Sequence, residues 1–211
     1  MKTILVMAAL VSLQFAAAQK TMKLEDFKSI TLASDMKLEL VKSNENKVVY
    51  NGDENFDVKY NNGALAFEGE GNATLYYKNE LESITVGSDA EISGKDEIKG
   101  KHFNLTAGSD SEVHLSLNVE NLHVTAGSDS KVSLSGKAGS MSATIGSDGE
   151  YHSENLKVGD ASINLGSDAE GTMNASGIVN ANVASDSSLT VYGKPKKVNE
   201  IKGSDATIKV M

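Results

Sequence analysis

One tripeptide recurs along the chain from residue 87 onward and constrains the fold more than any other feature. Gly-Ser-Asp, with one Ala-Ser-Asp variant, occurs seven times, and successive aspartates are separated by 21, 19, 19, 20, 18 and 19 residues. A long period that drifts by a residue or two indicates stacked structural repeats with small insertions, because a coiled coil would need a fixed short period. The repeated aspartates are Asp89, Asp110, Asp129, Asp148, Asp168, Asp186 and Asp205.

The residues on either side of each triplet alternate between apolar and other residues, as they do in β-strands. Five and three positions before the first six aspartates stand apolar residues such as Ile84 and Val86, and three positions after each aspartate an apolar residue recurs, with Gly171 as the exception. Because side chains alternate across a strand, these residues should point inward. The motif serine and the small residue after the aspartate share this parity, whereas the aspartate should face outward.

A single repeat of this length cannot bury its own apolar residues. Stacking the repeats about 4.8 Å apart gives each one neighbours to pair with and closes a continuous narrow core. The sequence therefore predicts an all-β fold, a parallel β-helix (solenoid) with rungs of about 19 residues. The motif glycine is explained by a bend that needs positive φ or a close backbone approach. Ala184 replaces it once, where the bend is either less demanding or distorted.

An earlier copy of the triplet, Ala33-Ser34-Asp35, precedes Asp89 by 54 residues, which divides into three steps of 18. Asp53 and Gly71-Asn72 fall where the two missing corners would be. Residues 27–80 are therefore interpreted as degenerate rungs that precede the regular rungs of residues 81–211.

A β-hairpin is the competing interpretation of part of this segment. Phe56–Tyr60 would pair with Leu65–Phe67 across Asn61-Asn62-Gly63, since Asn-Gly is the strongest short hairpin signal. Both interpretations keep the chain all-β. No linker rich in Pro, Gly or Ser divides it, so a single solenoid domain over residues 27–211 is expected.

The first residues have the order of a secretory signal peptide. Lys2 is followed by an apolar run from Ile4 to Leu13 and by the small residues Ala16–Ala18, so cleavage after Ala18 is expected. The apolar run is too short for a membrane anchor. Residues 1–18 would then be removed and residues 19–26 would form a lead-in to the solenoid. The alternative is an N-terminal helix that packs on a core.

Composition narrows the classes of partner. The formal net charge is -9, all positive charge is lysine, and there is no cysteine. An acidic surface without arginine disfavours nucleic acid, anionic lipid and polyanionic sugars as partners. Without cysteine the exported chain cannot rely on disulfides. One proline and 19 glycines suit short strands joined by tight turns.

These features together resemble a known family. The secretion signal, the inward-alternating strands that end in Gly-Ser-Asp corners, the segment Leu38-Glu39-Leu40 and the segment Leu189–Pro195 are similar to the DUF2807 family, whose other name is the putative auto-transporter adhesin head GIN domain. The resemblance covers about Phe27 to Met211 and implies a single-stranded right-handed parallel β-helix, which agrees with the usual hand of parallel crossovers. It also implies a Bacteroidetes-type setting at the cell surface or in the periplasm, and brings no catalytic residues.

The aspartate column most invites a functional interpretation. Carboxylates stacked on one edge would lie about 5 Å apart and repel each other by about 1 kcal/mol per pair in water. Calcium could offset this repulsion, which makes the seven motif aspartates candidate ligands and calcium a candidate cofactor. Backbone N–H donors in Asx-type turns, with carboxylates splayed into solvent, are the alternative and are favoured. The Gly-Gly-x-Gly-x-Asp calcium repeat is absent.

Catalysis on a β-helix scaffold is the rival functional hypothesis. A glycosidase needs two carboxylates at a set separation, but the chain holds too many for the sequence to select a pair. Pectate-lyase-like enzymes, which this chain resembles only in fold, usually employ an arginine base, and the chain has none. The four histidines lack zinc-site spacing, and His114 and His123 fall on outward strand positions. No nucleophile elbow or phosphate loop is present.

Tyr76 and Tyr77, with Tyr50 and Tyr60 nearby, form the densest aromatic cluster. Exposed aromatics could stack on sugar rings or on a partner protein, so Tyr76 and Tyr77 are candidate ligand contacts. Covering one end of the solenoid is the preferred alternative, because an open strand edge invites association.

The sequence thus predicts a non-enzymatic, exported binding or structural protein of adhesin type. A surface glycan or protein is the expected partner, with no membrane insertion. A polysaccharide-acting hydrolase or lyase is the alternative function.

Overall fold

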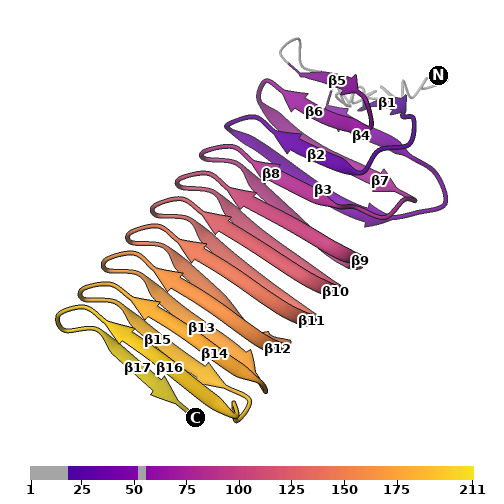
Figure 1. Ribbon diagram of the computed structural model, residues 1–211. Helices are drawn as coiled ribbons and strands as arrows, with labels where there is room; N and C mark the ends of the chain where they lie inside the picture. The colour runs from indigo at the N-terminus through magenta and orange to yellow at the C-terminus, as the bar shows by residue number, and fades with distance from the viewer. Residues whose placement is uncertain (1–18, 52–55) are drawn as a thin grey trace, which may run out of the picture.

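The computed structural model describes residues 19–51 and 56–211. In this part of the chain strands and turns are found but no helix, and 70% of the described residues are in strands. The strands form a β-solenoid of about seven turns with rungs of about 19 residues (Figure 1), so the predicted fold is confirmed. The signal peptide expected at residues 1–18 lies outside the described residues. Nowhere in the described residues does a helix occur that could cross a membrane.

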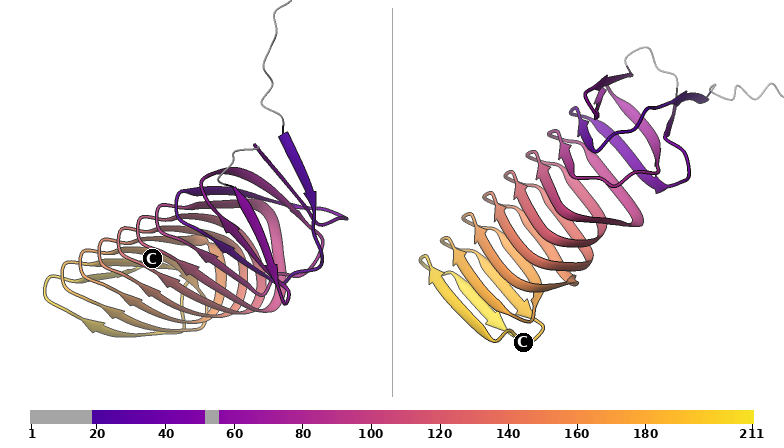
Figure 2. Two further views of the ribbon diagram at one scale, coloured as in Figure 1. Left: turned by 90° about the horizontal axis from the view of Figure 1, so that it is seen from above. Right: turned by 45° about the vertical axis from the view of Figure 1, so that its right-hand side comes forward.

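Each regular rung has two arms, joined at one edge by the triplet corner and at the other by a wider bend (Figure 2). In the middle of the solenoid one long strand leaves a corner, passes the bend and reaches the next corner. In the later rungs the strand is interrupted at the bend. The strands are β8 (Ser83–Val86), β9 (Glu91–Ala107), β10 (Glu112–Ala126), β11 (Lys131–Ile145), β12 (Glu150–Leu165), β13 (Glu170–Ala175), β14 (Ile178–Val183), β15 (Ser188–Tyr192), β16 (Lys197–Lys202) and β17 (Thr207–Val210).

Parallel pairing holds the rungs in register. Between β10 and β11, Val113 lies opposite Val132 and Val124 lies opposite Ala143, an offset of one rung. The residues predicted to point inward before each corner are buried, as Ile84 and Ile163 illustrate, and they belong to one continuous apolar core. At the inward position Gly171 a Cβ would lie 3.0 Å from the Leu165 side chain, so neighbouring leucines fill the space that a side chain would take.

The corners differ from the expectation in one respect and agree in another. Positive φ belongs to the aspartates, at 58° for Asp110 and 57° for Asp129, and not to the motif glycines. Asp and Asn tolerate this left-handed region better than other residues with a Cβ. Close approach favours glycine instead, since a Cβ on Gly127 would lie 2.7 Å from the Ser109 nitrogen, although the corner at Ala184 accommodates a Cβ.

The serine positions of the corner also separate into two kinds. The motif serines are partly exposed, which corrects the inward orientation predicted for them, because the left-handed aspartate interrupts the strand alternation. The small residue after the aspartate is buried, as predicted, in every corner except the last, where Ala206 is half-buried. In two corners this residue is a serine whose hydroxyl donates to the carbonyl of the motif glycine, from Ser111 to Gly108 and from Ser130 to Gly127, both at 2.6 Å. Ser187 donates instead to the carbonyl of Gly166 in the preceding corner.

The corner at Ala184 keeps the common geometry. The Ala184 nitrogen donates to the Leu165 oxygen at 3.0 Å, like the glycines of the other corners, and Asp186 has φ of 60°. This corner is therefore not distorted in either its hydrogen bond or its left-handed aspartate.

Residues 29–42 form a rung with a regular corner, since Asp35 has φ of 62°. Strand β2 (Ser29–Leu32) pairs in parallel with β8, and β3 (Met36–Lys42) pairs with β9, so that Ile30 lies opposite Ile84. The interval of 54 residues between Asp35 and Asp89 is therefore a single step of the solenoid. The interpretation of residues 27–80 as consecutive degenerate rungs is wrong.

The intervening chain builds an additional outer rung and covers it with antiparallel strands (Figures 1 and 2). The predicted hairpin is confirmed, with Asn62 and Gly63 at φ of 48° and 82°. The second strand of the hairpin (Ala64–Glu68) pairs in parallel with β2, and the strand that follows it (Gly71–Tyr77) pairs in parallel with β3. Both lie on the side of β2 and β3 that is opposite β8 and β9. The strands are β1 (Gln19–Lys23), β4 (Lys47–Asn51), β5 (Asp57–Asn61), β6 (Ala64–Glu68) and β7 (Gly71–Tyr77).

The corner expected at Gly71-Asn72 corresponds to the start of β7, where Gly71 has φ of 128°, while Asp53 lies outside the described residues. β4 runs antiparallel to both β7 and β1. Because the pairing changes from parallel to antiparallel here, the N-terminal end has no exposed strand edge on which a further regular rung could stack.

Replacing Gly127 with alanine tests the corner contact. A Cβ at 2.7 Å from the Ser109 backbone forces the two rungs apart, and we expect a loss of about 1–3 kcal/mol in the free energy of unfolding, measured by chemical denaturation. Gly100→Ala is the control, because its Cβ would lie 3.7 Å from the nearest atom. Equal stability of the two variants would contradict the role assigned to the glycine.

Candidate functional site

The arms that follow the corners present a charged outer surface, which we name the charged face. In successive rungs its first outward column contains ionisable side chains at matching register positions. Lys37 and Glu91 form an ion pair of 2.7 Å, and Lys131 and Glu150 one of 3.1 Å, with largely exposed side chains that contribute little to stability. The column comprises Lys37, Glu91, Glu112, Lys131, Glu150 and Glu170.

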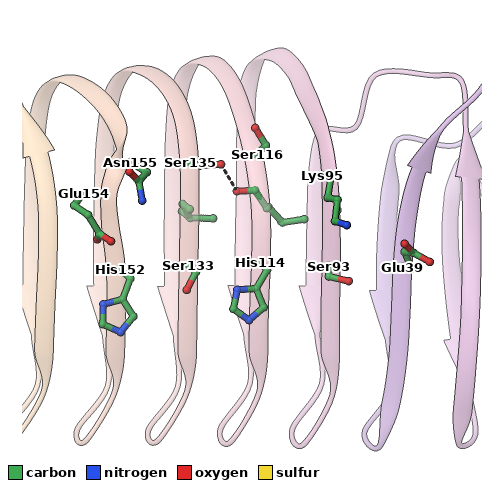
Figure 3. Close-up of a pocket in the computed structure, with 13 residues that line it drawn as sticks. Glu39, Ser93, Lys95, His114, Ser116, Ser133, Ser135, His152, Glu154 and Asn155 are labelled. Carbon is green, nitrogen blue, oxygen red and sulfur yellow. Dashed lines mark hydrogen bonds between the residues drawn. The ribbon is translucent and has the colours of Figure 1, made fainter.

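A groove of about 550 Å³ crosses this face along the solenoid axis (Figure 3). It extends over five rungs, from β3 to β12, so at about 4.8 Å per rung it is about 19 Å long. Histidines, serines and charged residues face it from successive strands. The polar side chains are those of Glu39, Ser93, Lys95, His114, Ser116, Ser133, Ser135, His152, Glu154 and Asn155.

Two irregularities of the repeat place charged residues at the ends of the groove. Opposite Leu115 and Ser116 the register of β9 jumps from Gly94 to Glu97, so Lys95 and Asp96 are extra residues. Opposite β11 the register of β12 is shifted near Glu154. These insertions fall in the 21-residue and 20-residue intervals, where the drift of the period predicted them. β-Bulges of this kind redirect side chains and often adjoin functional sites.

The floor between the ends is formed by short side chains of β10 and β11. Ser116 and Ser135 lie on adjacent rungs, and the Ser135 hydroxyl is 3.5 Å from the Leu115 carbonyl oxygen (Figure 3). Ser133 lies between His114 and His152 in one column. The groove is hollow because hydroxyl-bearing residues alternate with larger ones, and it offers several hydrogen-bond donors and acceptors to a ligand.

Hydrogen bonds favour the ionised form of two carboxyl groups in and beside the groove, those of Glu154 and Glu150. The Thr172 hydroxyl, 2.5 Å from Glu154, lowers the pKa of that carboxyl group. Lys131 lowers the pKa of Glu150, with a smaller contribution from His152. The His114 ring nitrogen lies 2.8 Å from the Glu112 carboxylate. The site thus presents fixed carboxylates and imidazoles around a neutral floor of serines.

The two carboxylates that line the groove do not form a hydrolytic pair with each other. Glu39 and Glu154 face the groove from rungs four steps apart, about 19 Å, whereas glycosidase carboxylates lie about 5–9.5 Å apart. His114 and His152 are two rungs apart, about 10 Å. Among the described residues no group of three or more His, Cys, Asp or Glu side chains is arranged to hold a metal ion.

The corners stack along one edge of the solenoid (Figure 1), and backbone hydrogen bonds between successive corners place the motif aspartates together there. The seven aspartates have φ between 57° and 60° and are exposed. The hydrogen bonds that join these corners come from the backbone, as when the Asp110 nitrogen donates to the Ser128 oxygen of the next rung at 3.1 Å. The carboxylates therefore extend toward water, and calcium binding stays a prediction.

The tyrosine candidates belong to the outer rung on β7. Tyr77 is 1% exposed, and burial raises the pKa of its phenol to about 12. Lys42 lies 4.6 Å from the centre of its ring. Tyr76 is half-buried beside Lys47. The folded protein thus gives a surface ligand no access to Tyr77, and both rings pack at the N-terminal end of the solenoid.

Residues 26–195 match the family DUF2807, described as "putative auto-transporter adhesin, head GIN domain". The chain belongs to this family. The resemblance found in its sequence is thereby confirmed. No curated protein matches the chain in sequence.

Solved structures with the same fold include proteins of Bacteroides and Parabacteroides species. A putative adhesin of Bacteroides fragilis is 16% identical with a TM-score of 0.83, and the match covers 92% of this chain and 96% of that one. A putative adhesin of Parabacteroides merdae is 12% identical, with a TM-score of 0.70 and coverages of 92% and 95%. A putative lipid binding protein of Parabacteroides distasonis is 15% identical, with a TM-score of 0.66 and coverages of 92% and 96%. At these identities the DUF2807 chain shares the fold with them.

The groove residues of this DUF2807 protein were missed by sequence reasoning. His114 was assigned to an outward position, which its exposure confirms, but it was not linked to His152, Glu39 or Glu154. The available signal was the drift of the repeat, because the longer intervals mark the bulges that bound the groove.

Replacing Asp110, Asp129 and Asp148 together by asparagine tests the aspartate column. Asparagine tolerates the same left-handed backbone but removes the charge, so we expect a higher melting temperature than wild type at low ionic strength. The difference should vanish in about 0.5 M salt, where exposed charges are screened. Asp129→Ala is the control and should melt lower at every salt concentration. A gain for the triple variant that persists in salt would contradict charge repulsion.

The calcium hypothesis has a separate test. A site that binds calcium only in the folded state raises the melting temperature, so thermal unfolding in calcium should occur above that in chelator. Magnesium at the same ionic strength controls for screening. Equal melting temperatures in calcium and chelator would eliminate a calcium role for the column.

Proposed function

We propose that this DUF2807 protein is a non-enzymatic, exported binding protein of adhesin type that holds a polar ligand in the groove of the charged face. The groove carries the proposal, because the repeat deviates from its regular register at the bulges that place charged side chains at the groove ends. The family description and the neighbouring structures described as adhesins support the same class.

The scaffold suits binding by a preformed surface. The groove floor lies on β10 and β11, which pair with each other and with the next strand on either side. The backbone hydrogen bonds between paired strands fix the positions of side chains on them, so ligand binding costs little conformational entropy of the protein. An elongated groove lined by serines, carboxylates and imidazoles fits an extended polar chain, either a surface glycan or a peptide segment.

The chemistry of the groove favours binding over catalysis. Its two carboxylates are too far apart to act on one glycosidic bond, and Glu154 is held ionised by Thr172, which is unsuited to a general acid. The arginine base of β-helix lyases is missing from the sequence. Export, expected from residues 1–18, would place the protein in the periplasm or on the cell surface.

The groove can be filled without touching the core. Ser133→Trp places a large ring on the groove floor, and we expect it to reduce binding at least tenfold to the ligand found on arrays of bacterial and host glycans and peptides. Ser188→Trp is the matched control, since Ser188 is an outward serine of the same face beyond the groove. Affinities are measured by biolayer interferometry on protein with unchanged thermal unfolding.

Two results would contradict the proposal. Equal loss of binding in Ser133→Trp and Ser188→Trp would show that the groove is not the site. Release of shorter products from any glycan by the purified protein, abolished in Glu154→Gln, would establish the rival glycan-acting enzyme.

A further inference from the structure

The second outer surface of the solenoid, formed by the arms that precede the corners, has a different chemistry from the charged face. We name it the neutral face. Register pairing places two ranks of outward residues on it, one residue per rung in each rank. One rank is Ser29, Ser83, Asn104, His123, Ser142, Ser162, Asn180 and Asn199, and the other is Thr31, Thr85, Thr106, Thr125, Thr144, Asn164 and Asn182.

The two ranks of the neutral face lack formal charge over seven consecutive rungs, and in the eighth rung the exposed Ile201 lies opposite Asn182. Apart from His123, its two ranks contain only Ser, Thr and Asn, although 23% of the whole chain is Asp, Glu, Lys or Arg. The corresponding column of the charged face is ionisable in six successive rungs. The two ranks therefore carry no formal charge, whereas charged residues such as Asp160 and Lys197 lie beside them nearer the bend.

The ranks are regular and stiff. Neighbouring residues of a rank lie about 4.8 Å apart along the axis, and the two ranks are about 6.6 Å apart along the strand. Thr85, Thr106, Thr125 and Thr144 are exposed in consecutive rungs. A β-branched threonine has few rotamers, so its hydroxyl and methyl groups are held in place before a ligand arrives.

A shallow hollow of about 260 Å³ lies beside the ranks and spans three rungs. Asn104, His123 and Ser142 line it from one rank, and Asn121 and Ser140 line it from the side nearer the bend. The Ser140 hydroxyl donates to the Asn121 side-chain oxygen at 2.9 Å, which orients that amide. The hollow thus adds fixed polar groups to an otherwise level surface.

We propose that the neutral face binds an uncharged, hydroxyl-rich polysaccharide that lies along the solenoid axis. Such a polymer needs many modest hydrogen bonds at a regular spacing and no counter-charge, which the two ranks supply. The threonine methyl groups can contact the C–H surfaces of sugar rings. The aspartates of the corners at the edge of this face would repel a polyanion. A cationic chain would bind the carboxylates of those corners or of the charged face instead of the neutral face. This surface is separate from the groove and does not depend on ligand binding there.

Hydroxyl removal tests the proposal without adding bulk. In the mature full-length protein, Thr85, Thr106 and Thr125 are replaced together by valine, which keeps shape and β-propensity. Binding to soluble dextran, laminarin and yeast mannan is measured by affinity electrophoresis, with polygalacturonate as the charged comparison. We expect wild type to bind at least one neutral polymer, with less than about a twofold change between 0.05 and 0.5 M salt, because no charges are paired.

The triple variant should lose at least tenfold in that binding, while Thr190→Val on the charged face keeps it. Three results overturn the proposal: no neutral polymer binds, the triple valine variant binds as tightly as wild type, or polygalacturonate binds better than the neutral polymers. Ser133→Trp separates the two surfaces, because it should leave neutral-polymer binding unchanged. Loss in Ser133→Trp but not in the triple variant would assign the polymer to the groove.

Discussion

The backbone contact between stacked corners is the interaction on which the rest of the solenoid depends. Each motif glycine lies so close to the preceding corner that a Cβ would be 2.6–2.8 Å from its backbone at Gly87, Gly108, Gly127, Gly146 and Gly166. The left-handed aspartate then turns the chain, and its amide donates to the next corner. Because the corners stack this closely, the arms on both sides must run in register, and every outward residue becomes part of a column.

The two ends of the solenoid solve the edge problem in different ways. At the N-terminal end the hairpin of β5 and β6 and the antiparallel β4 replace the regular edge. In the rung of β16 and β17, Glu200 and Lys202 lie opposite the buried Ala181 and Val183 and form an ion pair of 3.2 Å. Charged residues at inward positions make another apolar rung unfavourable there, a recognised protection against edge pairing.

Local sequence signals correctly predicted the features that are determined within a single rung. They failed where segments far apart in the sequence could each pair with the same strand edge. Alternation identified the buried positions, and Asn62-Gly63 identified the hairpin, because each rule acts over a few residues. The placement of β6 and β7 outside β2 could not be predicted, since an interval of 54 residues is equally consistent with three regular steps. Similarly, parity placed the motif serine inside because it ignored the left-handed aspartate that follows.

The same limits explain why the groove was invisible in the sequence and the neutral face was not recognised. A groove residue such as Glu154 can be recognised as part of a site only after the bulge and the register place it in one groove with His152 and Ser135. No sequence motif links these residues. The neutral face follows from a polar-x-Thr pattern before the triplet, with Asn164 and Asn182 in place of threonine in two later repeats, but its lack of charge is a property of the assembled ranks. Since one corner contact aligns both columns, substitutions on either face can change its chemistry rung by rung without disturbing the core between them.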